Sequence, residues 1–355
     1  MYWKVQKINF DGKKAISVDS NCIFTGRRKT YTAMNGGEII ICAGALGSPK
    51  ILINSLLKPV YSNDDSDDSN NGSHKQQVGW KSTPVFIPGI GNNLQDHTTL
   101  PLISFSNWSS PLKSKGGTHP PNGVHGWINL DKDGNVIGKE SSGGSEPVAQ
   151  LLYVDGRISS ALMPELMLPY YDDDSLYSKY LRPFLLNILL YLITWSVVQW
   201  FCSHCSGFLV CSTRRQSKGS ILLNPDNPLL DFTIDPQYND NDHNDDIIVK
   251  NGINTANKLL RSFGIHVSVF PFFFLSQSQS IKLFTTSYYH ICGTCSMPSK
   301  TDPNRETVVD DELRVNGIKN LRIADASVIP EIPSGPITAI TMCIGVAAAE
   351  FIKKR

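Results

Sequence analysis

Two histidines lie in short motifs with glycine and polar residues, and these side chains could carry acid–base chemistry. His290 opens the segment His-Ile-Cys-Gly-Thr-Cys-Ser-Met, and His97 closes the segment Pro-Gly-Ile-Gly-Asn-Asn-Leu-Gln-Asp-His. Histidine suits the role of a general base because its ordinary pKa lies near neutrality. A buried histidine satisfied by the backbone is the alternative for each. We predict a structural role for His97.

Eight cysteines are the other reactive side chains. Two pairs have Cys-x-x-Cys spacing, Cys202 with Cys205 and Cys292 with Cys295. Four thiolates would suffice for a zinc site. The alternative is buried or free thiols in a reducing compartment. We favour this alternative and predict no metal site, because one pair falls inside the longer histidine motif and the other ends an apolar segment.

A strand, a glycine turn and a helix are expected in succession at residues 38–53. Glu-Ile-Ile-Ile-Cys-Ala is a continuous apolar run, which suits a strand buried on both faces. Gly44 supplies the turn, and Ser48 and Pro49 suit the N-cap and first position of a helix. Such a strand–turn–helix unit presents a helix N-terminus to phosphate or cofactor groups.

The flanking segments give further expectations. Residues 5–10 and 14–18 alternate in polarity around Asp11-Gly12, which predicts a hairpin. Residues 61–77 are polar and of low complexity, which predicts a disordered surface insertion. Residues 243–264 carry apolar positions near helical spacing, which predicts a helix.

Length and charge limit the class of protein. The chain has 355 residues and a net charge of +1. This length suggests roughly two domains, and the absence of a basic stripe argues against a nucleic-acid partner. The N-terminus has no apolar run typical of a signal peptide. A cytoplasmic or a membrane-associated location is compatible with these features.

The stretch at residues 184–202 is apolar and carries no charge. A membrane span needs about 20 apolar residues, so the length is marginally sufficient. One interpretation is a span or a helix that rests on the membrane. The other is a buried or substrate-lining helix of the second domain. We prefer the second, because folded sequence is expected on both sides, and membrane association stays an alternative.

Three segments, in this order, resemble the glucose–methanol–choline (GMC) oxidoreductases. Residues 37–53 resemble the family's second signature, whose backbone packs against the flavin. Residues 88–97 resemble its Gly-x-Asn-Leu-Gln-Asp-His element. Residues 290–297 match His-x-x-Gly-Thr-x-x-Met and are followed by a matching segment at residues 308–330. The resemblance covers nearly the whole chain apart from residues 61–77 and a variable middle.

The resemblance implies an FAD-dependent oxidoreductase that acts on the CH–OH group of a small alcohol, hydrophobic alcohols included. His290 would be the catalytic base, and a hydride would pass from the carbinol carbon to flavin N5. Thr338 would stand where the family has a histidine or asparagine that faces the substrate hydroxyl. Because threonine is no ready base, two alternatives stay open: a non-catalytic remnant, and a flavin enzyme with lyase- or decarboxylase-like chemistry.

The resemblance also implies the residues that bind FAD. They include Ala43 and Gly44 in the strand-to-helix turn, and Asn93 in the second motif. Asp325 would lie near the ribityl–pyrophosphate part of FAD, and Ala326 would offer a backbone N–H beside it. A helix cap or turn is the alternative role for Asp325.

The Gly-x-Gly-x-x-Gly turn that opens a Rossmann unit does not occur in these 355 residues. We therefore expect the C-terminal portion of a family member, lacking the N-terminal Rossmann FAD-binding fingerprint. The expected fold class is α/β + α+β. Residues 1–97 would be a remnant of the FAD-binding domain, and residues 98–285 a substrate-binding domain with an antiparallel sheet covered by helices. Residues 286–355 would return to the FAD-binding domain and carry the catalytic motif.

Overall fold

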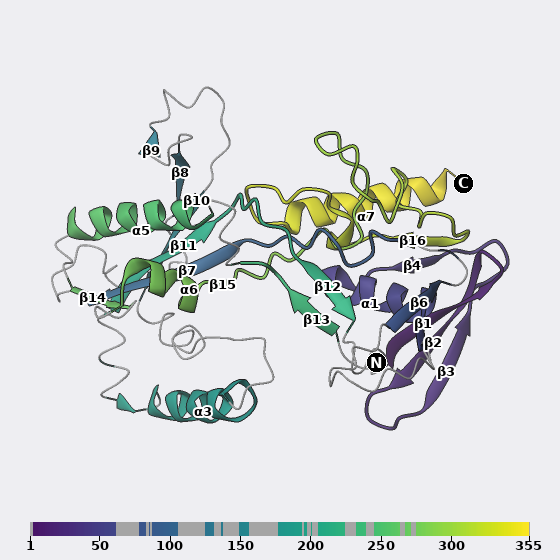
Figure 1. Ribbon diagram of the computed structural model, residues 1–355, viewed down its shortest axis with the longest axis horizontal. Helices are drawn as coiled ribbons and strands as arrows, with labels where there is room; N and C mark the ends of the chain where they lie inside the picture. The colour runs from purple at the N-terminus through teal and green to yellow at the C-terminus, as the bar shows by residue number, and fades with distance from the viewer. Residues whose placement is uncertain are drawn as a thin grey trace, which may run out of the picture.

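The N-terminal part of the molecule is a three-stranded antiparallel sheet of order β1-β2-β3 (Figure 1). The strands are Trp3–Asp11, Lys14–Cys22 and Arg28–Thr32. The chain reverses between β1 and β2 at Gly12, whose φ of 55° favours glycine. The predicted hairpin is therefore confirmed.

The computed structural model describes residues 3–61, 78–82, 85, 87–105, 125–130, 136–137, 149–155, 177–193, 195–196, 200, 205–223, 232–238, 245–262, 267–270 and 275–354.

Strand β4 and helix α1 form the expected strand–turn–helix unit, and β4 runs parallel to β16 from the far end of the chain. Their bounds are Ile39–Ile41 for β4, Gly44–Leu56 for α1 and Leu321–Ile323 for β16. The predicted helix start is wrong. Helix α1 begins at Gly44, whose φ is 77°, so that Ser48 and Pro49 lie inside the helix.

Pro49 is tolerated inside α1 because another segment makes the hydrogen bond that it cannot make. Proline has no N–H, so the carbonyl of Ala45, four residues earlier, loses its partner within the helix. The hydroxyl of Thr294 donates to this carbonyl, with an oxygen–oxygen distance of 2.5 Å. Thr294 is fully buried. The N-terminal half of α1 therefore depends on the segment that follows His290.

Replacing Thr294 by valine should lower the free energy of unfolding by about 1–3 kcal/mol, because the buried carbonyl of Ala45 loses its donor. Urea unfolding followed by circular dichroism measures this loss. Thr294→Ser keeps the hydroxyl and is the matched control. In the double variant Pro49→Ala/Thr294→Val, the alanine N–H restores a donor, so part of the loss should be recovered. A double variant no more stable than Thr294→Val would contradict this account.

The middle of the chain folds around an antiparallel sheet of order β14-β7-β11-β10-β8-β9, with β15 also paired to β7. Helices α5 and α6 pack against it (Figure 1). The sheet strands are Thr98–Phe105 (β7), His125–Leu130 (β8), Val136–Ile137 (β9), Ala149–Asp155 (β10), Cys205–Ser212 (β11), Val267–Phe270 (β14) and Thr286–Ser287 (β15). The helices are Asp245–Ser262 (α5) and Gln277–Phe284 (α6). The predicted helix at 243–264 and the antiparallel sheet are therefore present.

Apolar side chains of this sheet and of α5 make one buried core. Its members include Leu100, Leu102, Leu151, Val210, Val249, Ile253, Ala256 and Leu260. The four α5 residues recur at positions three and four apart, which places them on one face of the helix. This core fixes β7, and β7 begins directly after His97.

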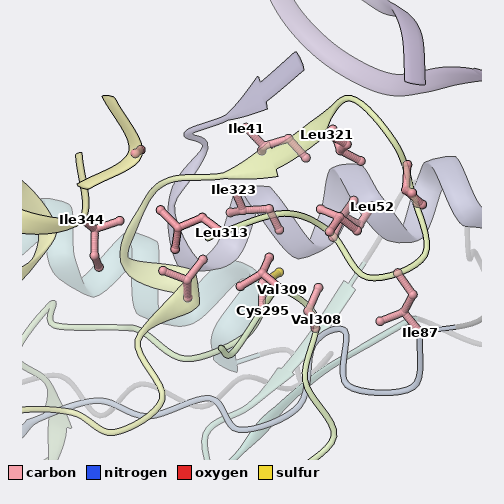
Figure 2. Close-up of a cluster of buried hydrophobic side chains, with 14 of the residues drawn as sticks. Ile41, Leu52, Ile87, Cys295, Val308, Val309, Leu313, Leu321, Ile323 and Ile344 are labelled. Atoms are coloured by element: carbon pink, nitrogen blue, oxygen red, sulfur yellow. The ribbon is translucent and has the colours of Figure 1, made fainter. Parts of the chain in front are cut away.

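A second core joins the N-terminal and C-terminal parts of the chain (Figure 2). It brings together residues of α1, β4, β16 and α7 (Thr338–Lys353), among them Ile41, Leu52, Ile323 and Ile344. The short helix η2 (Ala326–Val328) is buried beside it. Cys292 and Cys295 are fully buried free thiols in this core. Cys202 and the side chain of Cys205 lie outside the described residues.

Two short hairpins complete the described strands. The first pairs β12 (Ser220–Leu223) with β13 (Phe232–Asp235), and the second pairs β5 (Leu57–Tyr61) with β6 (Val78–Ser82). Apart from Tyr61, which ends β5, the predicted disordered insertion at 61–77 lies outside the described residues.

Helix α3 (Arg182–Ile193) carries part of the uncharged stretch and follows the π-helical turn η1 (Tyr177–Leu181). It lies away from the antiparallel sheet in Figure 1. Phe184 is 61% exposed and Tyr191 is 65% exposed, so the described part of the stretch is not a buried helix. None of the described helices combines the length and apolarity that crossing a bilayer requires. A substrate-lining role of this stretch stays a prediction.

Candidate active site

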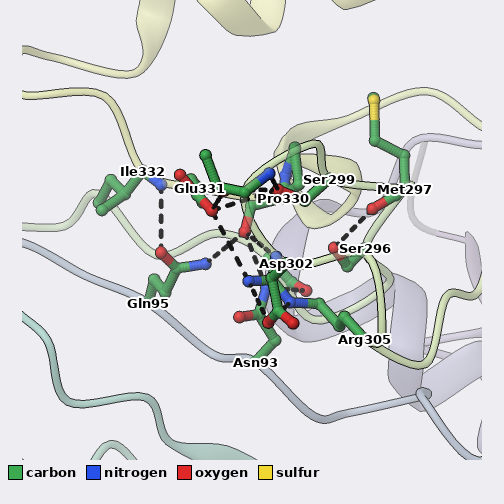
Figure 3. A network of polar contacts seen from close by, with 12 residues as sticks. Asn93, Gln95, Ser296, Met297, Ser299, Asp302, Arg305, Pro330, Glu331 and Ile332 are labelled. Carbon is green, nitrogen blue, oxygen red and sulfur yellow. Dashed lines mark hydrogen bonds and ion pairs between the residues drawn. The ribbon is translucent and has the colours of Figure 1, made fainter.

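The segment that ends at His97 holds a loop of the C-terminal part through alternate side chains. The amide nitrogens of Asn93 and Gln95 both donate to the carbonyl of Pro330, at 3.2 and 2.9 Å. The Oε1 of Gln95 accepts the backbone N–H of Ile332 at 3.1 Å. Figure 3 shows these contacts around Pro330. The loop is thereby fixed relative to His97.

Asp96 positions the backbone of His290. Its Oδ1 accepts the N–H of His290 at 2.9 Å, and its Oδ2 accepts the hydroxyls of Tyr238 and Ser287, both at 2.5 Å. Burial raises the pKa of Asp96, and the hydrogen bonds from Ser287, Tyr238 and His290 act against this rise. Three donors converge on one carboxyl group, so Asp96 links the main chain of His290 to the side chains of Tyr238 and Ser287.

The rings of His97 and His290 meet edge to face, with 82° between their planes and 2.8 Å between their Nδ1 atoms. The Nε2 of His97 lies 2.9 Å from the carbonyl oxygen of Pro333. Burial, aided by His290, lowers the pKa of His97 to about 4. Burial also lowers the pKa of His290, against the attraction of the Asp96 carboxylate. Both rings are therefore neutral near pH 7, and a neutral imidazole can accept a proton.

Lowering the pH from about 7 to about 4.5 should destabilise the fold in part through His97. Its pKa is about 4 in the folded chain against an ordinary value of 6.5. Between these values the unfolded chain binds a proton that the folded chain does not, so stability falls as the pH falls. Urea unfolding at both pH values measures the effect. His97→Asn does not titrate in this range and should lose less stability than the wild type; equal losses would exclude His97 as a source.

Asp325 accepts hydrogen bonds from the turn at Gly44, which we predict to bind the cofactor. Its Oδ2 accepts the N–H of Gly44 at 3.0 Å and the hydroxyl of Ser48 at 2.5 Å. Its Oδ1 accepts the N–H of Ser327 at 2.8 Å, which makes Asp325 the N-cap of η2. The helix-cap role considered for Asp325 is therefore present. Both carboxylate oxygens of Asp325 already accept hydrogen bonds from the protein. Direct contact between Asp325 and FAD stays a prediction.

The turn also has features that fit a bound FAD. Beside Gly44 the space is open, since a Cβ there would meet no atom within 4 Å. The backbone N–H of Ala43 donates to the Oγ of Ser48, which keeps the turn closed at the N-terminus of α1. The Oδ1 of Asn93 is buried and has no hydrogen-bond partner in the described part of the chain. A buried oxygen of this kind is free to accept a hydrogen bond from a bound group.

Thr338 opens α7 and is exposed. Among the described residues no hydrogen bond joins it to His290. The hydroxyl of Thr341, one turn further on, donates to the carbonyl of Ile337 within the helix. A role of Thr338 toward substrate therefore stays a prediction, as do the roles of Ala43 and Ala326 toward FAD.

The contact between His97 and His290 has no signal in the sequence of either motif. The two residues are 193 positions apart. Tyr238 and Ser287, which bind Asp96, belong to no motif. The only available hint is the adjacent pair Asp96-His97, which combines an acid with a histidine at the end of a motif.

Two sequence profiles described as GMC oxidoreductase match the chain, the N-terminal one at residues 2–99 and the C-terminal one at residues 215–345. Together they cover more than half of the chain and include both His97 and His290. This chain belongs to the GMC oxidoreductase family. FAD is accordingly its cofactor, as in GMC oxidoreductases.

Several relatives support this assignment. Pyranose dehydrogenase from Agaricus campestris is 27% identical over 87% of this chain and 49% of its own length. Oxygen-dependent choline dehydrogenase from Brucella ovis is 25% identical over 99% of this chain and 57% of its own length. The chain thus spans about half the length of the curated relatives that it matches. The crystal structure of pyridoxine 4-oxidase from Mesorbium loti has the same fold, with a TM-score of 0.63 and 18% identity over 99% of this chain and 57% of that one.

The expectation of a C-terminal portion alone is wrong. The N-terminal GMC profile matches residues 2–99, so both domains of the family are represented in this GMC chain. The FAD-binding domain is recognised by more than its Gly-x-Gly-x-x-Gly turn. In this chain it includes the β1–β3 sheet, the β4–α1 unit and the motif that ends at His97.

Proposed function

We propose that this GMC chain takes part in the FAD-dependent oxidation of the CH–OH group of small alcohols. The observation that carries the proposal is the position of His290. Its ring is half-buried, its backbone is held by Asp96, and its Nδ1 lies 2.8 Å from the Nδ1 of His97. A neutral imidazole held in this way is suited to accept the hydroxyl proton of a substrate.

FAD, when bound, accepts the hydride that leaves the carbinol carbon. Within the chain, Gly44 and Ala43 would hold the cofactor beside the N-terminus of α1, and Asn93 would offer its free Oδ1. Asp325 would keep the turn at Gly44 in shape. Thr338 would donate or accept one hydrogen bond at the substrate hydroxyl, a role that a threonine side chain can fill.

The substrate class follows from the relatives and from the charge of the chain. The names of the relatives point to a pyranose in one case and to choline in another. A chain with a net charge of +1 has no strong overall preference for acidic or basic substrates. Small hydroxyl compounds such as sugars and amino alcohols are therefore the substrates to test first.

The test uses the purified chain mixed with FAD. Flavin absorbance should elute with the protein in gel filtration, and anaerobic addition of glucose or choline should bleach it. His290→Ala should retain the flavin but bleach far more slowly. Flavin that separates from the protein would show that this chain alone does not form the site, and bleaching that is unchanged in His290→Ala would remove His290 from the reaction.

Membrane association through the stretch at 184–202 is a separate prediction, favoured by the exposed apolar side chains of α3. Burying a large apolar side chain is worth about 1.5–3 kcal/mol. The chain should therefore float with phosphatidylcholine vesicles in a density gradient, and Phe184→Ser/Tyr191→Ser should abolish flotation. Tyr31→Ser, at an exposed aromatic of β3, is the matched control. A chain that stays with the unbound fraction would contradict the prediction.

A further inference from the structure

The carbonyls of Pro333 and Thr213 both face the ring of His97, and the contact of Pro333 with Nε2 assigns the proton of the ring to that nitrogen. The carbonyl of Pro333 lies 2.9 Å from the Nε2 of His97, and a carbonyl oxygen can only accept a hydrogen bond. The loop that presents this carbonyl is held in place by Gln95 and Asn93, which lie two and four residues before His97. The Nε2 of His97 is therefore protonated. Since His97 is only 1% exposed, burial favours the neutral ring, and its Nδ1 carries a lone pair.

This lone pair in turn determines the proton position on His290. The two Nδ1 atoms are 2.8 Å apart, so one of them must donate and the other accept. Because the Nδ1 of His97 has no proton to give, the Nδ1 of His290 is the donor. A neutral imidazole has one N–H, and the Nε2 of His290 is left with the lone pair.

Other contacts keep His290 in this orientation. The carboxyl group of Asp96 holds its backbone N–H at 2.9 Å, and the ring of Tyr288 packs edge-on with 4.9 Å between centroids. Asp96, His97 and Tyr288 are titratable groups that face His290 among the described residues. Asp96 accepts from the backbone of His290, whereas the ring of His290 donates its hydrogen bond to the Nδ1 of His97.

We propose that His97 is a positioning residue that fixes the tautomer of His290, so that the Nε2 of His290 is the atom that accepts the substrate proton. The tautomer follows from the geometry, whereas its use in catalysis rests on the proposed function. When Nε2 takes up the proton, the His290 ring becomes cationic, and its Nδ1–H to His97 becomes a charge-assisted hydrogen bond, which is stronger than a neutral one. His97 stays neutral throughout and neither gains nor loses a proton.

The decisive test is a long-range proton–nitrogen NMR spectrum of the uniformly labelled chain, with and without FAD, near pH 7.5. The signals of His290 are assigned by their loss in His290→Ala. We expect the Nδ1 of His290 to show the chemical shift of a protonated ring nitrogen and its Nε2 that of an unprotonated one. The reverse pattern in the wild type would overturn the proposal. This readout needs no substrate, so it separates the tautomer from the proposed function.

Two variants of His97 provide matched controls. Asn places a carboxamide oxygen near the position of the His97 Nδ1 and can still accept from His290, so His97→Asn should keep the tautomer. His97→Phe has no acceptor and should shift His290 toward the form protonated at Nε2. Flavin bleaching by substrate should slow about 10–100-fold in His97→Phe, the range found for residues that orient metal-binding histidines, and should recover at least in part in His97→Asn. Equal tautomer populations in wild type and His97→Phe would also overturn the proposal.

If the tautomer is as proposed but no substrate bleaches the flavin, then the proposed function fails and the inference about His97 stands. Retained flavin in both variants, measured by gel filtration, excludes loss of the cofactor as the cause of a slower reaction. Thermal melting of His97→Phe and His97→Asn identifies any general loss of structure.

Discussion

Replacing His290 by alanine should lower kcat/KM for a CH–OH donor by about 10²–10⁴-fold, the range that a general base contributes. The physical reason is that a hydroxyl proton must leave as the hydride leaves, and the alanine variant offers no group to accept it. Stopped-flow reduction of the bound flavin under anaerobic conditions measures the step directly. The fold should persist, since the side chain of His290 is only half-buried.

The neighbouring Tyr289 provides the matched control, because it is 88% exposed and lies in the same loop. Tyr289→Ala should reduce the flavin at close to the wild-type rate. His290→Gln supplies polar atoms without a base and should be nearly as slow as His290→Ala. A His290→Gln rate close to that of the wild type would mean that the residue orients substrate by hydrogen bonding and takes no proton.

Replacing Asp325 by alanine should lower the free energy of unfolding by about 3–5 kcal/mol and abolish the retention of FAD. Asp325 is 6% exposed and accepts hydrogen bonds from Gly44, Ser48 and Ser327. The alanine variant leaves the buried donors of Ser48 and Ser327 and the half-buried N–H of Gly44 without this partner, and each buried donor costs about 1–3 kcal/mol. Urea unfolding gives the stability, and gel filtration with FAD gives the retention.

Asp311 is the control for this loss, since it is an exposed acid in the same part of the chain. Asp311→Ala should stay within about 0.5 kcal/mol of the wild type. Asp325→Asn keeps one acceptor oxygen, but its amide N–H₂ group would face donors that Asp325 now accepts from. Because two donors cannot hydrogen-bond to each other, this variant should also be destabilised. Retention of FAD by a folded Asp325→Ala variant would show that the turn at Gly44 does not need this carboxyl group.

The local sequence predicted the hairpin between β1 and β2 and the helix α5, because each of them depends on residues that are close together in the chain. The hairpin at Asp11-Gly12 follows from a turn that only a residue tolerant of positive φ forms easily. The helix α5 follows from apolar residues at helical spacing. The start of α1 did not follow in this way. It lies at Gly44 because Asp325 and Thr294, more than 240 positions away, satisfy groups that Ser48 and Pro49 would otherwise leave unpaired.

The family and its cofactor could be predicted from sequence motifs, because each motif is a short run of consecutive residues. The extent of the family match could not be inferred from the absence of one glycine turn, because the FAD-binding domain is assembled from separate segments. The N-terminal profile match at residues 2–99 reflects those other segments.

The motif around His290 is visible in the sequence, and so is its capacity for acid–base chemistry. The groups that surround His290 are known only from the folded chain. His97 and Asp96 reach His290 across more than 190 positions, and Pro333 reaches His97 across more than 230. The proton position on a histidine depends on the donors and acceptors that face both of its nitrogens. These groups come from three separate segments, around His97, His290 and Pro333, so no local pattern could specify their contacts.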